Sequence, residues 1–156
     1  MNDIRSAPAI VVMGVAGCGK TVMGEALAEA LGAVFIEGDR LHPPKNVARM
    51  ARGEPLTDAL REGHKPVAAC SALKRSYRNR LLSFCPGIVF LYLKIDRETA
   101  RRRVSGRKGH FMPASLVDSQ FATLEEPEPD EPAVTADGAR SVAAILKQAL
   151  SSSPSS

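Results

Sequence analysis

The strongest constraint on the fold is an eight-residue stretch, GVAGCGKT, that follows a short apolar run. The run AIVVM at 9–13 is rich in β-branched residues, which is typical of a buried strand in a parallel sheet. A helical pattern begins near Lys20 and continues to Leu31. The stretch between them fits the pattern G-x-x-x-x-G-K-[ST]. The sequence therefore predicts a phosphate-binding loop between a buried strand and a helix.

This loop predicts how a nucleotide and a metal ion would be held. Its glycines let successive backbone N–H groups converge on phosphate oxygens, and the following helix adds the positive end of its dipole. The lysine can reach the β- and γ-phosphates, and the threonine hydroxyl can bind Mg²⁺. The predicted cofactor-binding residues of the loop are Gly14, Val15, Ala16, Gly17, Cys18, Gly19, Lys20 and Thr21.

Strands and helices alternate along the chain. The predicted strands are 9–13, 33–36, 66–70, 88–93 and a weak one at 133–135, and the predicted helices are 20–31, 42–51, 72–82, 97–106, 114–124 and 141–150. This order predicts an α/β fold in three layers, with a parallel sheet of about five strands covered by helices on both faces. We expect one domain at 9–150, between an N-terminal tail at 1–8 and a disordered tail at 151–156. Ligands of such folds bind at the carboxyl ends of the strands.

Composition narrows the class of function. The chain has 156 residues, a net charge of +4, only 4% aromatic residues and three cysteines at irregular spacing. Few aromatic residues argue against a nucleic-acid partner, and no apolar run approaches the roughly 20 residues of a membrane span. An odd number of cysteines argues against a disulfide framework and favours a reducing, cytoplasmic location. A chain this short leaves no room for the switch regions of a GTPase, which favours a small-molecule or nucleotide kinase.

The acceptor side is predicted from residues that follow the second strand. Asp39 lies at the carboxyl edge of the sheet, where it can orient or deprotonate an attacking hydroxyl. His42, Asn46 and Arg49 share one face of the next helix, where they could hold a polyhydroxylated anion. Helix capping is the alternative interpretation for Asp39 and for His42.

Two basic segments complete the predicted site. Lys74 or Arg78, after the third strand, could bind a carboxylate or phosphate. The segment RVSGRKGH leaves a basic helix through a glycine and predicts a lid at about 106–114. That lid would offer Arg107 to the transferring phosphoryl group.

Longer segments identify a family. The stretches that carry the resemblance are GVAGCGKT, EGDRLHPPKNVARMARGEPLTD, ACSALKRSYR, FLYLK and RKGHFMPASLVDSQFATLEEP, which together cover most of residues 9–132. They resemble the small bacterial-type, thermoresistant-like gluconokinases, which belong to the shikimate-kinase-like and nucleotide-kinase-like P-loop group. The resemblance implies ATP-dependent phosphorylation of D-gluconate on its terminal primary hydroxyl, giving 6-phosphogluconate. It also implies a possible homodimer.

The resemblance also implies roles for individual residues. The loop from Gly14 to Thr21 would hold the ATP phosphates and Mg²⁺, Arg103 and Arg107 would close over the phosphates, and the catalytic residues would be Lys20, Asp39 and Arg107. The residues that would line the gluconate site are Asp39, His42, Asn46, Arg49, Lys74 and Arg78. Gln120 lies in a matched segment without an assigned role.

The sequence departs from the family after GEPLTD. Similar proteins continue there into a Trp-containing helix, whereas here Asp58 passes almost directly to the third strand, so about one acceptor-side helix is expected to be missing. Two alternative functions stay open for this reason. One is a P-loop kinase for another small hydroxylated acid or a nucleotide, and the other is a nucleotide-binding protein with impaired catalysis.

Overall fold

The computed structural model describes residues 3–38, 49–50, 52–105 and 114–151. Within these residues one five-stranded sheet is formed in the order β2-β3-β1-β4-β5, and every neighbouring pair is parallel. The strands are β1 (Ala9–Met13), β2 (Val34–Glu37), β3 (Pro66–Ala69), β4 (Ile88–Lys94) and β5 (Ala133–Asp137). The helices are α1 (Lys20–Leu31), α3 (Glu54–Arg61), α4 (Arg75–Phe84), α5 (Arg97–Ser105), α6 (Ala114–Thr123) and α7 (Val142–Ser151). The predicted α/β class and parallel sheet are confirmed.

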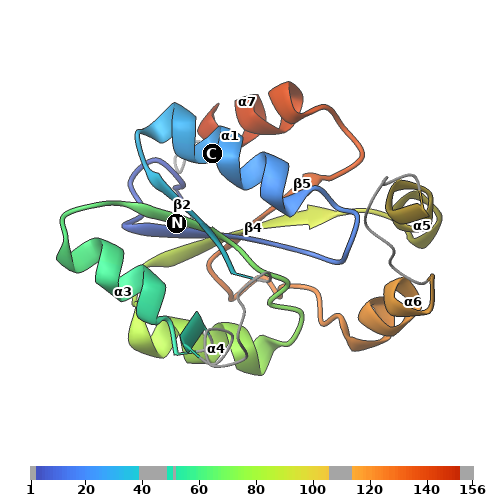
Figure 1. The fold of residues 1–156 in the computed structure, drawn as a ribbon, viewed down its shortest axis with the longest axis horizontal. Helices are drawn as coiled ribbons and strands as arrows, with labels where there is room; N and C mark the ends of the chain where they lie inside the picture. The colour runs from blue at the N-terminus through green and yellow to red at the C-terminus, as the bar shows by residue number, and fades with distance from the viewer. Residues whose placement is uncertain (1–2, 39–48, 51, 106–113, 152–156) are drawn as a thin grey trace.

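The sheet separates two apolar cores. Ile10 and Val12 of β1 pack in the core beneath α1 and α7, and Val11 and Met13 pack in the core toward α3 and α4. This alternation follows from the two-residue repeat of a strand, and both faces are buried because helices cover both. Figure 1 shows α1 and α7 on one side of the sheet, α3 and α4 on the other, and α5 and α6 beyond the end of β4.

A helix that the sequence analysis missed follows Gly53. The sequence predicts no helix between the one that ends at 51 and the strand at 66–70. In the structure α3 starts here: Gly53 adopts a left-handed φ of 69° and Pro55 lies in the first turn. Proline is tolerated there because the first amide groups of a helix have no acceptor within it. Gly53 and Pro55 therefore begin a helix.

The chain between α3 and β3 closes through a short turn. Backbone N–H groups of Glu62, Gly63 and His64 donate to the carbonyls of Asp58, Leu60 and Ala59, respectively. The described chain therefore runs without a break from α3 into the sheet. The absence of a further helix relative to similar proteins remains a prediction from the sequence.

Strand β5 is longer than expected. The sequence analysis described a stunted strand at 133–135, whereas β5 pairs with β4 over five positions, from Phe90↔Ala133 to Lys94↔Asp137. β5 lies at the edge of the sheet and is only partly buried. Strand propensity was a poor guide because the hydrogen bonds to β4 decide the conformation.

Candidate nucleotide-binding site

The phosphate loop joins β1 to α1 at the carboxyl edge of the sheet. Gly14 and Gly17 have φ values of 146° and 87°, which side chains with a Cβ rarely adopt. A Cβ on Gly14 would lie 2.7 Å from Cys18 Sγ, so the loop folds back closely on itself. The amide of Cys18 donates to Val15 O at 3.2 Å, and Lys20 Nζ donates to the same carbonyl at 3.4 Å. The lysine ammonium is thereby held against the loop.

Thr21 connects the loop to the neighbouring end of the sheet. Its hydroxyl donates to the Glu37 carboxylate, where Glu37 is the last residue of β2. A hydroxyl and one carboxylate suit Mg²⁺, which keeps several waters and is held by few protein groups plus substrate phosphates. Across the described part of the chain, no group of three or more His, Cys, Asp or Glu side chains could hold a metal ion. No role was predicted for Glu37, although it directly follows the predicted strand at 33–36.

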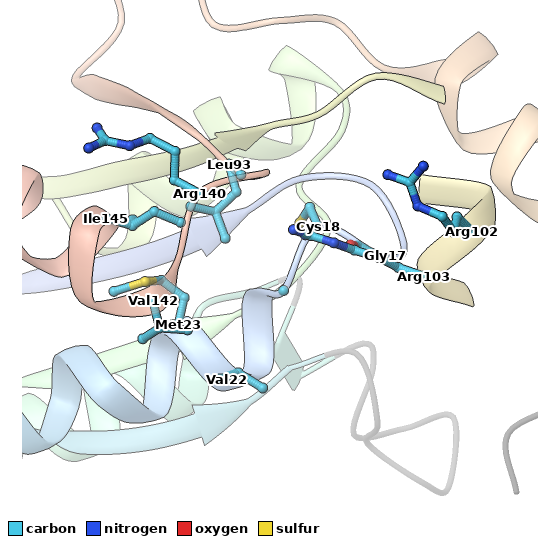
Figure 2. Close-up of a pocket in the computed structure, with 12 residues that line it drawn as sticks. Gly17, Cys18, Val22, Met23, Leu93, Arg102, Arg103, Arg140, Val142 and Ile145 are labelled. Atoms are coloured by element: carbon cyan, nitrogen blue, oxygen red, sulfur yellow. The ribbon is translucent and has the colours of Figure 1, made fainter. Parts of the chain in front are cut away.

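A cavity of about 470 Å³ opens beside the loop. Figure 2 shows the loop residues Gly17 and Cys18 between Arg102 and Arg140, which come from different parts of the chain. The lining residues are Gly17, Cys18, Gly19, Val22, Met23, Leu93, Arg102, Arg103, Gly138, Arg140, Val142 and Ile145. The wall therefore combines apolar side chains with cationic ones. Arg102 and Arg140 were missed as lining residues because the positions that face a cavity depend on the packing of α5 and of the segment after β5.

Helix α5 meets the loop directly. Arg103 Nη1 donates to Gly17 O at 3.2 Å, which places this predicted phosphate-binding residue at the loop. A Cβ on Gly17 would lie only 2.8 Å from Ala100 O of α5, so the two backbones are in close contact. The structure thus brings Arg103 together with the phosphate loop, and its contact with a phosphate remains a prediction.

Arg78 occupies a different environment from the predicted gluconate site. Its side chain is fully buried, and its guanidinium makes five hydrogen bonds: two to the Glu131 carboxylate and one each to the carbonyls of Ala72, Leu73 and Glu125. A guanidinium has five N–H groups, so none is left for a substrate. We therefore correct the predicted substrate contact of Arg78: its contacts hold the segment around Glu131 against the start of α4.

Two other predicted acceptor-site residues lie within the described chain. Arg49 pairs with Glu54 and Asp58, each at 3.1 Å. Lys74 is the N-cap residue of α4, and its side chain is exposed. The remaining predicted residues, Asp39, His42, Asn46 and Arg107, and the predicted lid lie outside the described residues.

The strand order, the loop and the adjoining cavity define a P-loop protein of the kinase type. The AAA domain family matches residues 10–127. A gluconokinase from Gluconobacter oxydans is 45% identical over 90% of this chain and 88% of its own length. The crystal structure of a gluconokinase from Sinorhizobium meliloti is 46% identical, with a TM-score of 0.72 over 91% of this chain and 89% of that one. The chain belongs to the gluconokinase family of P-loop kinases.

A more distant likeness concerns the fold alone. Shikimate kinase from Aquifex aeolicus is 15% identical, with a TM-score of 0.59 over 91% of this chain and 94% of that one. The resemblance to gluconokinases is confirmed, and the fold is shared with shikimate kinase. Within the described residues, every helix is too short or too polar to span a bilayer.

Proposed function

We propose that this protein transfers the γ-phosphoryl group of ATP to a hydroxyl of D-gluconate, giving 6-phosphogluconate and ADP. The observation that carries the proposal is the phosphate loop, with Lys20 and the Thr21–Glu37 pair at the carboxyl edge of the sheet, in a member of the gluconokinase family. In this reaction a hydroxyl oxygen of gluconate forms a bond to the γ-phosphorus. The bond to the bridging oxygen of ADP breaks, and the hydroxyl proton leaves to a base or to water.

The phosphate loop and its neighbours supply most of the proposed ATP contacts. Loop amides and Lys20 hold the phosphates, and Arg103 lies close enough at Gly17 to add positive charge. Thr21 and Glu37 would hold Mg²⁺, which neutralises charge on the β- and γ-phosphates when bound. The adenosine would lie in the cavity between Arg102 and Arg140, whose wall is partly apolar (Figure 2).

The acceptor side of the proposal rests on sequence motifs. Asp39 would orient or deprotonate the acceptor hydroxyl, and Arg107 would contact the phosphoryl group. Among residues of the described chain, Lys74 has the exposure that a gluconate contact requires. Arg49 would have to exchange an ion pair with Glu54 or Asp58 for a contact with substrate.

A cytoplasmic location is part of the proposal. Cys18, Cys70 and Cys85 are buried and form no disulfide within the described chain, which suits a reducing compartment. The homodimer that the family resemblance implies remains a prediction.

A coupled ADP-release assay tests the function. ADP formation should require both gluconate and Mg²⁺, and Lys20→Ala should lower the rate by at least about a hundredfold, because a charge that stabilises the transferring group is lost. Lys147→Ala, on the exposed surface of α7, is the matched control. Faster turnover with shikimate or a nucleoside monophosphate than with gluconate would show that the faster acceptor is the substrate. ATP binding without transfer to any acceptor would argue for a nucleotide-binding protein.

A further inference from the structure

Two helices hold the backbone of the phosphate loop from positions far along the chain. Arg103 of α5 donates to Gly17 O at 3.2 Å, and Gln120 Oε1 of α6 accepts a hydrogen bond from the Ala16 amide at 2.6 Å. The arginine was expected near the phosphates, but no role was expected for the glutamine. Consecutive residues of the loop are thus bound by side chains from α5 and α6.

The glutamine acts on a peptide group that also contacts the lysine. The Ala16 N–H and the Val15 carbonyl belong to one planar peptide unit, and in a trans peptide they point in opposite directions. The carbonyl end accepts from Cys18 N at 3.2 Å and from Lys20 Nζ at 3.4 Å. By fixing the N–H end, Gln120 also fixes the carbonyl that positions the lysine ammonium.

The two helices form a stiff support for this contact. Asp118 of α6 pairs with Arg101 of α5 through a short hydrogen bond and lies 3.8 Å from Arg97 Nε. The Arg97 guanidinium lies 5.4 Å from the centre of the Phe121 ring, which adds a cation–π contact between the helices. Gln120 therefore projects from a helix whose position is set by several contacts with α5.

We propose that Gln120 is a positioning residue for ATP binding, which orients the Val15–Ala16 peptide and so preforms the phosphate loop around Lys20. The proposal rests on the proposed function only in requiring that the loop binds ATP. A loop that is already ordered loses less conformational freedom when the nucleotide binds. Without the glutamine acceptor, the Val15–Ala16 peptide keeps only the contacts at its carbonyl end, and part of the affinity is spent on ordering it.

Binding of Mg²⁺–ATP, measured by calorimetry without gluconate, tests the proposal. Gln120→Met keeps the side-chain length but removes the acceptor, and it should raise the Kd for ATP roughly three- to tenfold, the effect of one hydrogen bond. The KM for gluconate should stay within twofold of the wild type. Gln148→Met is the matched control, because Gln148 is also a helical glutamine and donates to Thr135 O away from the loop.

The Ala16 amide gives a readout that general loss of stability would not mimic. In ¹⁵N NMR spectra of the nucleotide-free protein, hydrogen exchange of this amide should accelerate in Gln120→Met. It should stay slow in Gln120→Glu, which keeps an oxygen acceptor. Gln120→Asn, whose side chain is one methylene shorter, provides a second loss-of-contact variant if the methionine variant does not fold.

The outcomes separate this proposal from the proposed function. Unchanged ATP binding by Gln120→Met would overturn the positioning role. Tighter binding would overturn it too, because it would mean that Gln120 competes with a phosphate oxygen for the Ala16 amide. Unchanged protection of the Ala16 amide would overturn it as well. If ATP binds as expected but gluconate is not phosphorylated, only the proposed function fails. Absence of ATP binding by the wild-type protein would overturn both.

Discussion

Thr21 is the residue at which the phosphate loop and the end of β2 meet. Its hydroxyl binds the Glu37 carboxylate directly, so in the free protein the proposed Mg²⁺ ligands are already adjacent. A metal ion would have to replace that hydrogen bond by binding between the two groups. The residue therefore offers a specific test of the metal site.

Thr21→Val keeps the branched shape of the side chain and removes the hydroxyl. We expect the Mg²⁺ concentration that gives half-maximal activity to rise about tenfold or more, because one proposed ligand is lost. The measurement is a Mg²⁺ titration of the ADP-release rate. Thr123→Val is the control, since the Thr123 hydroxyl donates only to Ser119 O on the surface of α6. An unchanged titration would exclude Thr21 as a ligand.

Arg78 and Glu131 form the buried ion pair beneath the segment that follows α6. The arginine is 0% exposed and its Nε lies 2.7 Å from Glu131 Oε1. Burial raises the pKa of Glu131, but hydrogen bonds from Arg78 and from the Glu128 amide outweigh burial and leave the pKa below its ordinary value of 4.5. The carboxylate is therefore charged at neutral pH and depends on its partner.

Arg78→Met should lower the free energy of unfolding by about 3–5 kcal/mol, because it leaves a buried carboxylate without its cation. Urea unfolding at pH 7 measures the effect. Arg61→Met is the control: Arg61 pairs with Asp58 on the surface, where removal should cost within about 0.5 kcal/mol. Equal losses of unfolding free energy in the two variants would show that burial does not make the Arg78–Glu131 pair more important for stability than a surface pair.

At the scale of elements, the contact between α5 and the phosphate loop depends on a glycine. Gly17 has a φ of 87°, and a Cβ there would press on the Ala100 carbonyl of α5. Gly63, in the turn after α3, has a nearly equal φ of 85° but no heavy atom within 4 Å of an added Cβ. Alanine at either position would carry a similar backbone cost in free energy of unfolding. Only at Gly17 would the added Cβ also clash with a neighbouring element.

Gly63→Ala should reduce the free energy of unfolding by about 1–2 kcal/mol, the cost of a left-handed residue with a Cβ. Gly17→Ala should cost about 1–3 kcal/mol more, because the backbone of α5 must move away from the loop. Urea unfolding of both variants measures the difference. Equal costs would mean that α5 does not rest on the loop as the structure describes.

The whole molecule should lose stability in acid, because several carboxyl groups have lowered pKa values in the folded state. Hydrogen bonds from Thr99 lower the pKa of Asp96, and the Arg75 guanidinium lowers that of Asp130, in addition to Glu131. For such groups the stabilisation is present above the unfolded pKa and is lost as the pH falls through the lower folded pKa.

Urea unfolding between pH 3 and pH 7 should therefore show nearly constant stability above about pH 5 and a decline below the ordinary carboxyl values of 3.8 to 4.5. In Arg78→Met, Glu131 loses the hydrogen bonds from the Arg78 guanidinium and keeps only the Glu128 amide and the more distant Arg75 charge against burial, so its pKa should rise. The difference in free energy of unfolding between the wild type and Arg78→Met should therefore become smaller as the pH falls and Glu131 is protonated. If this difference in free energy of unfolding did not change with pH, Glu131 would not be the charged group that Arg78 stabilises.

The fold class, the phosphate loop and the family can all be predicted from local patterns in the sequence. These patterns are a β-branched run before GVAGCGKT, the alternation of strands and helices, and motif segments with fixed spacing. Helix α1 begins and ends at the predicted residues for the same reason, since Gly32 stops it with a left-handed φ of 65°. Such signals act over a few neighbouring residues and can be read without knowing the packing.

Which side chains meet at the site depends on how distant elements pack against one another. Arg78 and Gln120 both lay in recognised motifs, but the structure directs one into the core with Glu131 and the other to the Ala16 amide. Arg102 and Arg140 join one cavity although they are distant in sequence. A basic or amide side chain bonds to whichever donor or acceptor packing brings within about 3 Å, and that choice is set by contacts between distant elements.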